Sequence, residues 1–511
     1  MGILQSFYHR ARAHVTQDLP RRARADANVL LIWYTPDIPH SKGDTPMRRL
    51  LLIVGALFLV SGSLEAQSSP PFLGLGDSIG EGVQSLDAAA QTQVNGYLNL
   101  IGTQMGFAFP LPLIETGPLG VVGSVFDRNR IYPLVLASNL ASSGTDSTSI
   151  LTELAGTPIV NEADLVLSPR TGVSQISIAE SLRSPLIICW VGNNDVLGAV
   201  TEFDQLNPTE IASQITPTAT FDANYAQITS RLGALGSKVV YANIPDVTEA
   251  AFLFSPQDLV TFLGSDYGLP QGSYTTLIAM LLIKLGLDDG SILQNPNWVL
   301  DPSEIQTIEQ AISTFNHIIA VRAAKAYAPV VDLNGLSRRF VQTPPVVGSF
   351  TLTRSYLGGL FSLDGVHPSD IGYALVANQF IQTIDNYYHL HIPAISATGL
   401  VNILDADPFV DFNHSLVVRG RPGVGLLETL GLYLGISGDQ GNTPLVSPGV
   451  KPALGQRFME QYLISQGKDP NTKWTRDDAI AAFRQIFHYT NQQKHQPVVI
   501  VPGHTEVLPH D

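Results

Sequence analysis

Short apolar runs of four to six residues recur along this chain, and longer stretches with helical character separate them. The runs are Phe72–Leu75, Leu186–Val191, Val239–Ile244 and Val330–Leu333. Polar and apolar residues do not alternate in them, as they would in a strand with one solvent-exposed face. The runs are therefore typical of parallel strands covered on both faces. Strands of this kind that alternate with helices predict a three-layer α/β/α sandwich around a mostly parallel sheet.

The helix predicted at Glu304–Tyr327 has the clearest start signal. Asp301 can cap it, Pro302 suits its first position, and Glu304 completes a capping-box arrangement. A second helix is predicted at Tyr225–Leu235, between two of the apolar runs. The spacing of these helices supports the α/β class.

The charge of the chain argues against a nucleic-acid partner. Its 511 residues include 29 Lys or Arg and 44 Asp or Glu, which gives a net charge of −15. Residues 1–66 hold eight basic and five acidic residues, so the remainder, with 21 basic and 39 acidic, carries −18. Such an acidic body repels phosphate backbones. The single cysteine, Cys189, excludes an internal disulfide and a Cys-rich metal site.

A leader is expected at residues 47–66. Met47-Arg48-Arg49 precedes eleven apolar residues, Leu50 to Val60, and a small-residue exit ends at Ala66. This is the layout of a secretory signal peptide, and the apolar core is too short to span a bilayer as a helix. We therefore expect a secreted or periplasmic protein with no stable membrane span in its mature chain. Residues 1–46 are interpreted as an upstream extension absent from the mature protein; a buried core helix or a membrane anchor is the alternative for the apolar run.

Two segments look like insertions, and the end of the chain changes character. Residues 105–137 are rich in Pro and Gly, and residues 247–300 are notably apolar. The run Leu277–Ile283 within the second segment favours core packing over a lipid-binding surface. Residues 393–511 form a C-terminal extension of unknown role, with one clear helix that opens at Thr475.

A candidate nucleophile follows the first apolar run directly. In Gly76-Asp77-Ser78-Ile79-Gly80, a serine occupies a glycine-flanked turn between a strand and a helix. Such a turn exposes the hydroxyl and brings helix N-terminal amides close to it. The pentapeptide also fits the G-x-S-x-G elbow of α/β-hydrolases, but that fold needs several strands before its serine. Ser78 stands twelve residues past Ala66, so those strands have no room.

A candidate base and its partner lie near the other end of this region. Asp364 stands three residues before His367, in a tight loop just ahead of a helix. A serine nucleophile needs a base to take its proton, and the base needs a partner that fixes its tautomer. Asp364 and His367 can supply both, although a capped loop with a surface histidine would give the same local pattern.

Two segments between these ends can supply an oxyanion hole. Asn194, in Gly192-Asn193-Asn194-Asp195, follows the run that ends at Val191, so it should lie at the same edge of the sheet as Ser78. Gly144 ends Asn139-Leu140-Ala141-Ser142-Ser143-Gly144, and a glycine N–H can approach a ligand closely. A side-chain-capped turn and a simple loop glycine are the alternatives for these two residues.

In order and content, these segments resemble the SGNH (GDSL-type) hydrolase family over roughly residues 72–388. The name-giving residues fall on Ser78, Gly144, Asn194 and His367, and Ala242 to Thr248 looks like a segment of secreted bacterial members. The resemblance implies a flavodoxin-like sheet of about five strands within residues 67–392. It also implies a carboxylic ester hydrolase with Ser78, Asp364 and His367 as catalytic residues. The Ser78 and Gly144 amides and the Asn194 side chain would form the oxyanion hole, with no metal or organic cofactor.

The substrate and the exact reaction stay open at this level. A small-molecule or lipid ester with a medium or long acyl chain is favoured by the apolar insertion, with an acetyl-carbohydrate esterase as the alternative. An acyltransferase using the same site and an exported binding protein that retains the pocket are the other hypotheses. His389 and His391 lack a third metal ligand, and the acidic residues Asp405, Asp407 and Asp411 do not fit an EF-hand.

Overall fold

The structure is a computed structural model that describes residues 69–115, 129–203, 208–421 and 467–488, together with isolated positions between 427 and 463. The chain divides into Met1–Ser68 and Ser69–Asp511, and every described residue belongs to the second unit. The expected leader at 47–66 and the extension at 1–46 lie outside the described residues, as does part of the segment 105–137.

A parallel sheet forms the middle layer. Its order is β1-β2-β3-β6, with the strands at Phe72–Gly76, Leu186–Trp190, Lys238–Ala242 and Val330–Val331. On the free edge of β1, Gly74 makes a single parallel bridge to Asn139. There the Gly74 N–H donates to the Ser138 carbonyl at 3.0 Å, and the Leu140 N–H donates to the Gly74 carbonyl at 2.8 Å. The prediction of a parallel α/β sheet is therefore confirmed, and four strands with one added bridge approximate the expected five.

All four apolar runs form strands, with ends displaced by a few residues. Within Val330–Leu333, only Val330 and Val331 pair with β3. Asp332 instead caps the next helix, α15 (Leu333–Gln342), by accepting a hydrogen bond from the Gly335 N–H at 2.8 Å. A short acidic side chain favours this capping role over a place inside a strand.

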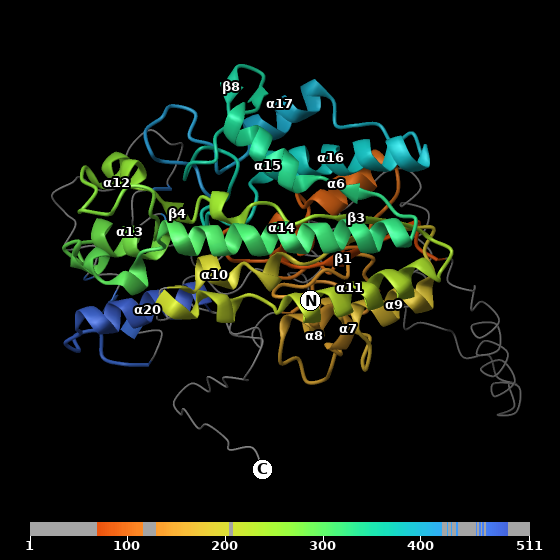
Figure 1. Ribbon diagram of the computed structural model, residues 1–511, viewed down its shortest axis with the longest axis horizontal. Helices are drawn as coiled ribbons and strands as arrows, with labels where there is room; N and C mark the ends of the chain where they lie inside the picture. The colour runs from red at the N-terminus through yellow and green to blue at the C-terminus, as the bar shows by residue number, and fades with distance from the viewer. Residues whose placement is uncertain are drawn as a thin grey trace, which may run out of the picture. The chain divides into compact units, whose positions relative to one another are not determined.

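Helices cover both faces of the sheet. One face packs against α8 (Glu162–Leu167), α9 (Gln175–Leu182), α11 (Thr218–Gly233) and α14 (Pro302–Lys325). The other face packs against α6 (Tyr97–Gln104) and α16 (Asp370–Tyr388). Figure 1 shows α6 and α16 on one side of the strands and α9 and α11 on the other. Alternate strand residues enter the two cores, with Leu73, Ile187 and Cys189 in the first and Phe72, Ile188 and Trp190 in the second.

The capping signals at the start of α14 are realised as predicted. Asp301 accepts hydrogen bonds from the Ser303 and Glu304 N–H groups, and the Glu304 carboxylate accepts one from the Asp301 N–H at 2.9 Å. Pro302 is the first residue of the helix. The helix predicted at Tyr225–Leu235 is the second half of α11.

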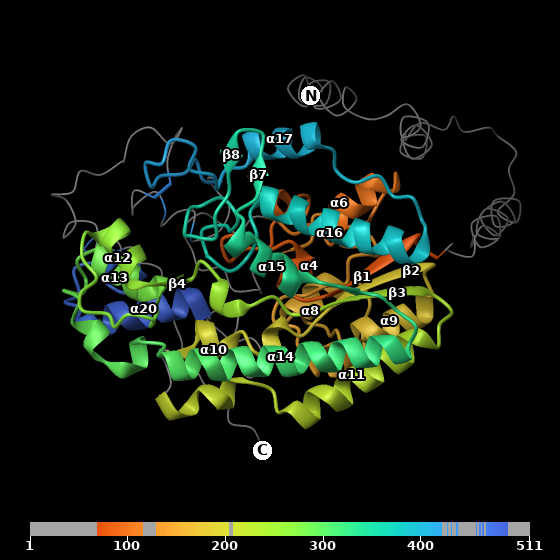
Figure 2. The same ribbon diagram turned by 45° about the horizontal axis from the view of Figure 1, so that its top comes forward.

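The apolar segment 247–300 forms a lobe at one end of the sandwich, together with α20 (Arg476–His488) from the C-terminal extension (Figures 1 and 2). We call this region the insertion lobe. It holds α12 (Pro256–Leu263), α13 (Leu277–Lys284) and a two-stranded antiparallel ribbon of β4 (Leu253–Phe254) and β5 (Thr275–Thr276).

The apolar face of the lobe is turned inward. Leu277 to Ile283 are all buried, and Ala479, Ala482 and Phe483 of α20 join the same core. The Arg476 guanidinium pairs with the Asp288 carboxylate at 2.5 Å. The run at 277–283 is therefore core.

The remaining elements are short or peripheral. They are α4 (Ser78–Glu81), α5 (Ala90–Gln93), α7 (Ser149–Thr152), α10 (Gly198–Thr201), α17 (Ala397–Ala406), β7 (Val346–Val347) and β8 (Phe350–Thr351). The 3₁₀ turns are η3 (Asn193–Asp195), η5 (Pro208–Gln214), η6 (Val247–Glu249), η7 (Ser291–Gln294) and η8 (Pro296–Trp298). Within the described residues, no helix combines the length and the apolar character needed to cross a membrane.

Candidate active site

The turn after β1 places Ser78 at the start of a helix. Gly76 ends the strand with φ 152°, and a Cβ there would lie 2.3 Å from the Trp190 carbonyl oxygen, so no side chain fits. Asp77 then caps α4, because its Oδ1 accepts a hydrogen bond from the Ile79 N–H at 3.0 Å. Ser78 is the first residue of α4, with its hydroxyl at the carboxyl edge of the sheet.

Ser78, His367 and Asp364 form a continuous hydrogen-bonded chain. The Ser78 Oγ lies 2.8 Å from His367 Nε2, and His367 Nδ1 lies 2.8 Å from Asp364 Oδ2. All three side chains are buried, with Ser78 9% and His367 6% exposed. The order of groups is that of a nucleophile, its base and the acid that orients the base. The structure therefore brings Ser78 into contact with His367, although 289 positions separate them in the sequence, and joins both to Asp364.

Asp364 is held as an anion by its own loop and by the segment that follows α4. Its two oxygens accept hydrogen bonds from the N–H groups of Val366 at 2.9 Å, His367 at 2.8 Å and Leu86 at 2.9 Å. Burial by itself would raise the pKa of Asp364, but the attraction to His367 and these hydrogen bonds outweigh it and hold the pKa below its ordinary value. A permanent charge beside Nδ1 fixes the imidazole with its free nitrogen toward Ser78.

Gly144 and Asn194 lie on the other side of the serine. Both line a cavity of about 40 Å³ together with Ser78 and His367. Gly144 has φ 77°, a left-handed conformation that glycine adopts without strain. The Asn194 Nδ2 donates to the Thr145 carbonyl at 2.9 Å, which ties the Asn194 turn to the Gly144 loop. The predicted oxyanion-hole residues thus face the same space as Ser78.

The profile of one protein family, described as GDSL-like Lipase/Acylhydrolase, matches residues 73–380. The chain belongs to this family. It is accordingly a carboxylic ester hydrolase, as the resemblance implied. The match includes all five predicted site residues and the segment 247–300, and it ends within α16.

Solved structures that match this hydrolase in a structural comparison have low sequence identity to it. TesA is 13% identical, with 62% of this chain and 98% of that chain covered and a TM-score of 0.29. Phospholipase A1 from Streptomyces albidoflavus NA297 is 14% identical, with 62% and 99% covered and a TM-score of 0.31. Axe2, an acetylxylan esterase from Geobacillus stearothermophilus, is 13% identical, with 62% and 94% covered and a TM-score of 0.31. A comparison with curated proteins gives no match.

Gln175 is a site residue of this GDSL-family hydrolase that the sequence did not reveal. It is buried at the start of α9, where its Oε1 accepts from the Gly76 N–H at 2.9 Å. Its Nε2 donates to the Gly76 carbonyl at 2.9 Å and to Thr145 Oγ1 at 3.1 Å. One amide therefore holds the nucleophile turn and the Gly144 loop at a fixed separation.

Glu81 performs a similar task from α4. Its Oε2 accepts hydrogen bonds from the Ser143 N–H at 2.7 Å and from the Ser143 hydroxyl at 2.5 Å. Because Glu81 is fully buried and Ser143 precedes Gly144, this contact fixes the Gly144 loop to the helix that carries Ser78. No local sequence pattern marks either partner, since the contact joins segments 62 residues apart.

Two further carboxylates lie under the site. Asp77 Oδ2 accepts from Asn193 Nδ2 at 2.8 Å, and burial raises the pKa of Asp77 to about 6 despite that hydrogen bond. Asp195 accepts from the Ser147 N–H at 2.8 Å and the Ser147 hydroxyl at 2.7 Å; burial raises its pKa to about 6 as well. Both acids anchor the turns that follow β1 and β2.

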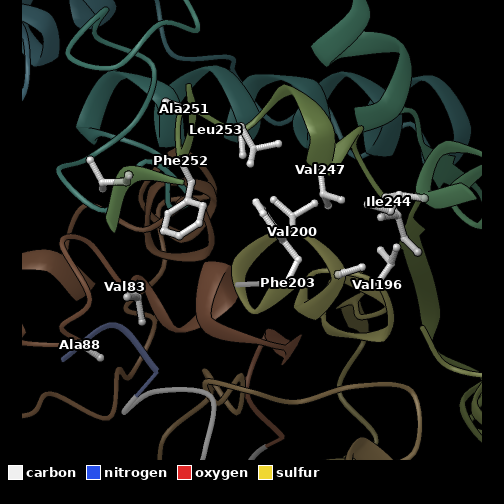
Figure 3. Packing of buried hydrophobic residues seen from close by; sticks show 14 of the residues in the cluster. Val83, Ala88, Val196, Val200, Phe203, Ile244, Val247, Ala251, Phe252 and Leu253 are labelled. Carbon is white, nitrogen blue, oxygen red and sulfur yellow. The ribbon is translucent and has the colours of Figure 1, made fainter. Parts of the chain in front are cut away.

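The insertion lobe contributes a wall of the catalytic cavity. Phe252 lines the cavity with Val83, Leu86, Leu197 and Val366, and Figure 3 shows its ring directed to the space between Val83 and Val200. The Phe252 N–H donates to the Gly365 carbonyl at 2.9 Å. A Cβ on Gly365, which has φ 69°, would lie 2.5 Å from the Phe252 nitrogen, so the glycine permits this close approach.

Two of the acidic residues considered as metal ligands, Asp407 and Asp411, instead bind backbone N–H groups. Asp407 accepts from the N–H groups of Ile371 at 2.7 Å and Phe409 at 2.9 Å. Asp411 accepts from the Leu416 N–H at 2.7 Å. Across the described part of the chain, no three His, Cys, Asp or Glu side chains are grouped so that they could hold a metal ion.

Proposed function

We propose that this GDSL-family hydrolase cleaves carboxylic esters through a covalent acyl-enzyme on Ser78. Ser78 Oγ attacks the acyl carbonyl while His367 Nε2 takes its proton, and Asp364 stabilises the imidazolium. The N–H groups of Ser78 and Gly144 and the Asn194 side chain bind the developing oxyanion. His367 then protonates the leaving alkoxide and activates a water that hydrolyses the acyl-enzyme. The observation that carries this proposal is the chain of 2.8 Å contacts from Ser78 through His367 to Asp364.

The test is covalent labelling with an organophosphonate, followed by peptide mapping. The wild-type protein should be labelled at Ser78, and Ser78→Ala should lose both labelling and ester hydrolysis while it keeps its fold. Ser230→Ala, which removes an exposed serine hydroxyl on α11, is the matched control and should keep both. Labelling at another residue, or hydrolysis that survives in folded Ser78→Ala, would contradict the assignment.

We further propose that medium or long acyl esters are preferred over acetyl esters. Support comes from the apolar wall of Leu86, Leu197, Phe252 and Val366 beside Ser78. Each buried methylene contributes roughly 0.8 kcal/mol, so an apolar wall favours longer chains. One observation favours the acetyl-ester alternative: the catalytic cavity holds only about 40 Å³. Kinetics with p-nitrophenyl esters of two to sixteen carbons separate the two, since a kcat/KM that peaks at acetate supports the alternative.

Export from the cytoplasm is a proposal that rests on the sequence at 47–66 alone. The basic start, the apolar core and the small-residue exit are the features that favour it. The N-terminal sequence of the mature protein tests it directly: a start near Gln67 in the secreted or periplasmic fraction supports export. Retention of residues 50–60 in the isolated protein would contradict it.

A further inference from the structure

A second cavity lies at the same edge of the sheet as Ser78. It has a volume of about 110 Å³ and is lined mainly by apolar side chains. Val247 and Ala250 come from the turn that follows β3, Phe340 comes from α15, and Leu360 and Phe361 come from the loop before His367. The second cavity therefore lies mainly over the ends of β3 and β6, whereas the catalytic cavity lies mainly over the ends of β1 and β2.

The two cavities share a wall. Leu197 and Val366 line both of them. Val366 precedes His367 in the catalytic loop, and Ile79, which lines the second cavity, follows Ser78. An acyl group attached to Ser78 Oγ therefore needs to pass only one layer of apolar side chains to reach the second cavity.

The volumes set how much of an acyl chain each cavity holds. An apolar cavity of about 150 Å³ binds benzene, which has six carbons. In proportion, the catalytic cavity of about 40 Å³ holds one or two carbons and the second cavity of about 110 Å³ holds roughly four. Together with the carbonyl carbon, this corresponds to an acyl group of about six to seven carbons.

A charged pair marks one limit of the second cavity. Glu249 and Arg354 line it and pair with each other at 2.5 Å, and their side chains are 28% and 36% exposed. A longer acyl chain would have to displace this partly solvated pair, which gains nothing from contact with methylene groups. The charged pair thus bounds the apolar part of the cavity on one side.

We infer that the second cavity is the subsite for the distal part of the acyl chain, and that it selects esters with acyl groups of about six to seven carbons. The inference rests on the proposed acyl-enzyme on Ser78. Leu197 and Val366 separate the carbonyl-binding part of the site from the chain-binding part. Substrates with acetyl groups use the first cavity alone, and chains longer than about seven carbons extend beyond the subsite at the Glu249–Arg354 pair.

The test compares acyl-chain profiles of the wild type and of a variant with a filled subsite. Ala250→Phe places a ring in the second cavity without touching the catalytic triad, and Ala324→Phe, at an exposed position of α14, is the matched control. In the wild type, kcat/KM for p-nitrophenyl esters should rise about fourfold per methylene over four methylenes, or roughly 200-fold. Ala250→Phe should remove most of that rise and change acetate hydrolysis less than twofold; Ala324→Phe should match the wild type.

Several outcomes would overturn the subsite. One is a wild-type profile that peaks at acetate, and another is an Ala250→Phe profile that keeps the wild-type rise. A third is an effect of Ala250→Phe on a series of alkyl acetates, which would place the alcohol group in the cavity. If Ala250→Phe does not fold, Val341→Trp at the exposed rim provides the same comparison. If the organophosphonate does not label Ser78 in the wild type, the acyl-enzyme itself is contradicted. Failure of the subsite and failure of the acyl-enzyme are therefore distinguishable.

Discussion

Replacing Asp77 by Asn should make the protein more stable at pH 8 and less active. Asp77 is 1% exposed, and burial raises its pKa to about 6 although the Asn193 side chain and the Ile79 N–H both favour the ionised form. Above pH 6 the folded protein therefore carries a buried charge at an energetic cost. Its carboxylate attracts a positive charge on His367, which explains why a costly anion is useful at this position.

The size and sign of the effect follow from linkage. The unfolded chain titrates Asp77 near its ordinary value of 3.8, and the folded chain titrates it at about 6, so the folded state holds the proton more tightly. The stabilisation is complete below pH 4 and is lost as the pH rises through 6. At 1.36 kcal/mol per pH unit, the difference amounts to about 3 kcal/mol at pH 8. Asp77→Asn stays uncharged and should recover up to about 3 kcal/mol there, with little change at pH 4.

The local hydrogen bonds can adapt to the substitution. The new Oδ1 can still accept from the Ile79 N–H, as Asp77 does at 3.0 Å. Asn193 Oδ1 has no hydrogen-bond partner within the described part of the chain. A flip of the Asn193 amide would turn that oxygen toward the new side-chain N–H, so neither group loses its bond.

Urea unfolding at pH 4, 5, 6 and 8 measures the effect, and p-nitrophenyl ester kinetics measure the loss in kcat/KM. Asp289→Asn removes a carboxylate from an exposed loop and should show no gain at pH 8. The difference in free energy of unfolding between Asp77→Asn and the wild type should grow from pH 4 to pH 8. A difference of the same size at both pH values would refute the reasoning. A comparable gain in Asp289→Asn would also refute it, because the cause would then be net charge and not burial.

Three other substitutions probe the residues that hold the site. Asn194→Ala should lower kcat by about 10²–10³-fold with little change in KM, as expected for one oxyanion donor. Gln175→Leu should lower the free energy of unfolding by about 2 kcal/mol, since the buried Gly76 N–H loses its acceptor while the Gly76 carbonyl keeps the Ser142 N–H, and should lower kcat more than KM. Arg421→Ala should lower stability by about 2 kcal/mol in urea unfolding, because Asp370 loses two charge-assisted hydrogen bonds at 2.8 Å, and Arg421→Lys should recover part of it.

The parts of the fold and site that sequence could predict are those with a local cause. The strand at Leu186–Trp190 follows from an unbroken apolar run, and the start of α14 follows from three capping residues within four positions. Asp364 and His367 stand in one loop, so their contact needs only a tight turn. The position of Ser78 at a strand end then follows from the geometry of a parallel sheet.

The parts that sequence could not predict depend on contacts between distant segments. Gln175 looks like an ordinary helix residue, and its role exists only because α9 passes under Gly76. The bridge of Asn139 to β1 has no run of β-branched residues to mark it. The docking of α20 onto the insertion lobe likewise depends on burial of Phe483 and on the Arg476–Asp288 pair.

The loop that carries His367 is held from two sides by segments with separate origins in the chain. On one side, the Phe252 N–H of the insertion lobe donates to the Gly365 carbonyl at 2.9 Å. On the other side, α16 begins three residues after His367, and Asp407 of the C-terminal extension accepts from the Ile371 N–H at 2.7 Å.

The C-terminal extension also reaches the nucleophile side of the site. Arg421 pairs with Asp370, and Asp370 accepts from Gln84 Nε2 at 2.9 Å, close to the end of α4. The family match ends at residue 380, so Asp407 and Arg421 lie beyond it. The insertion lobe and the C-terminal extension thus act on the same catalytic loop from opposite ends. A change in either segment can alter the distance between His367 and Ser78 without touching the triad, because the loop is anchored by both.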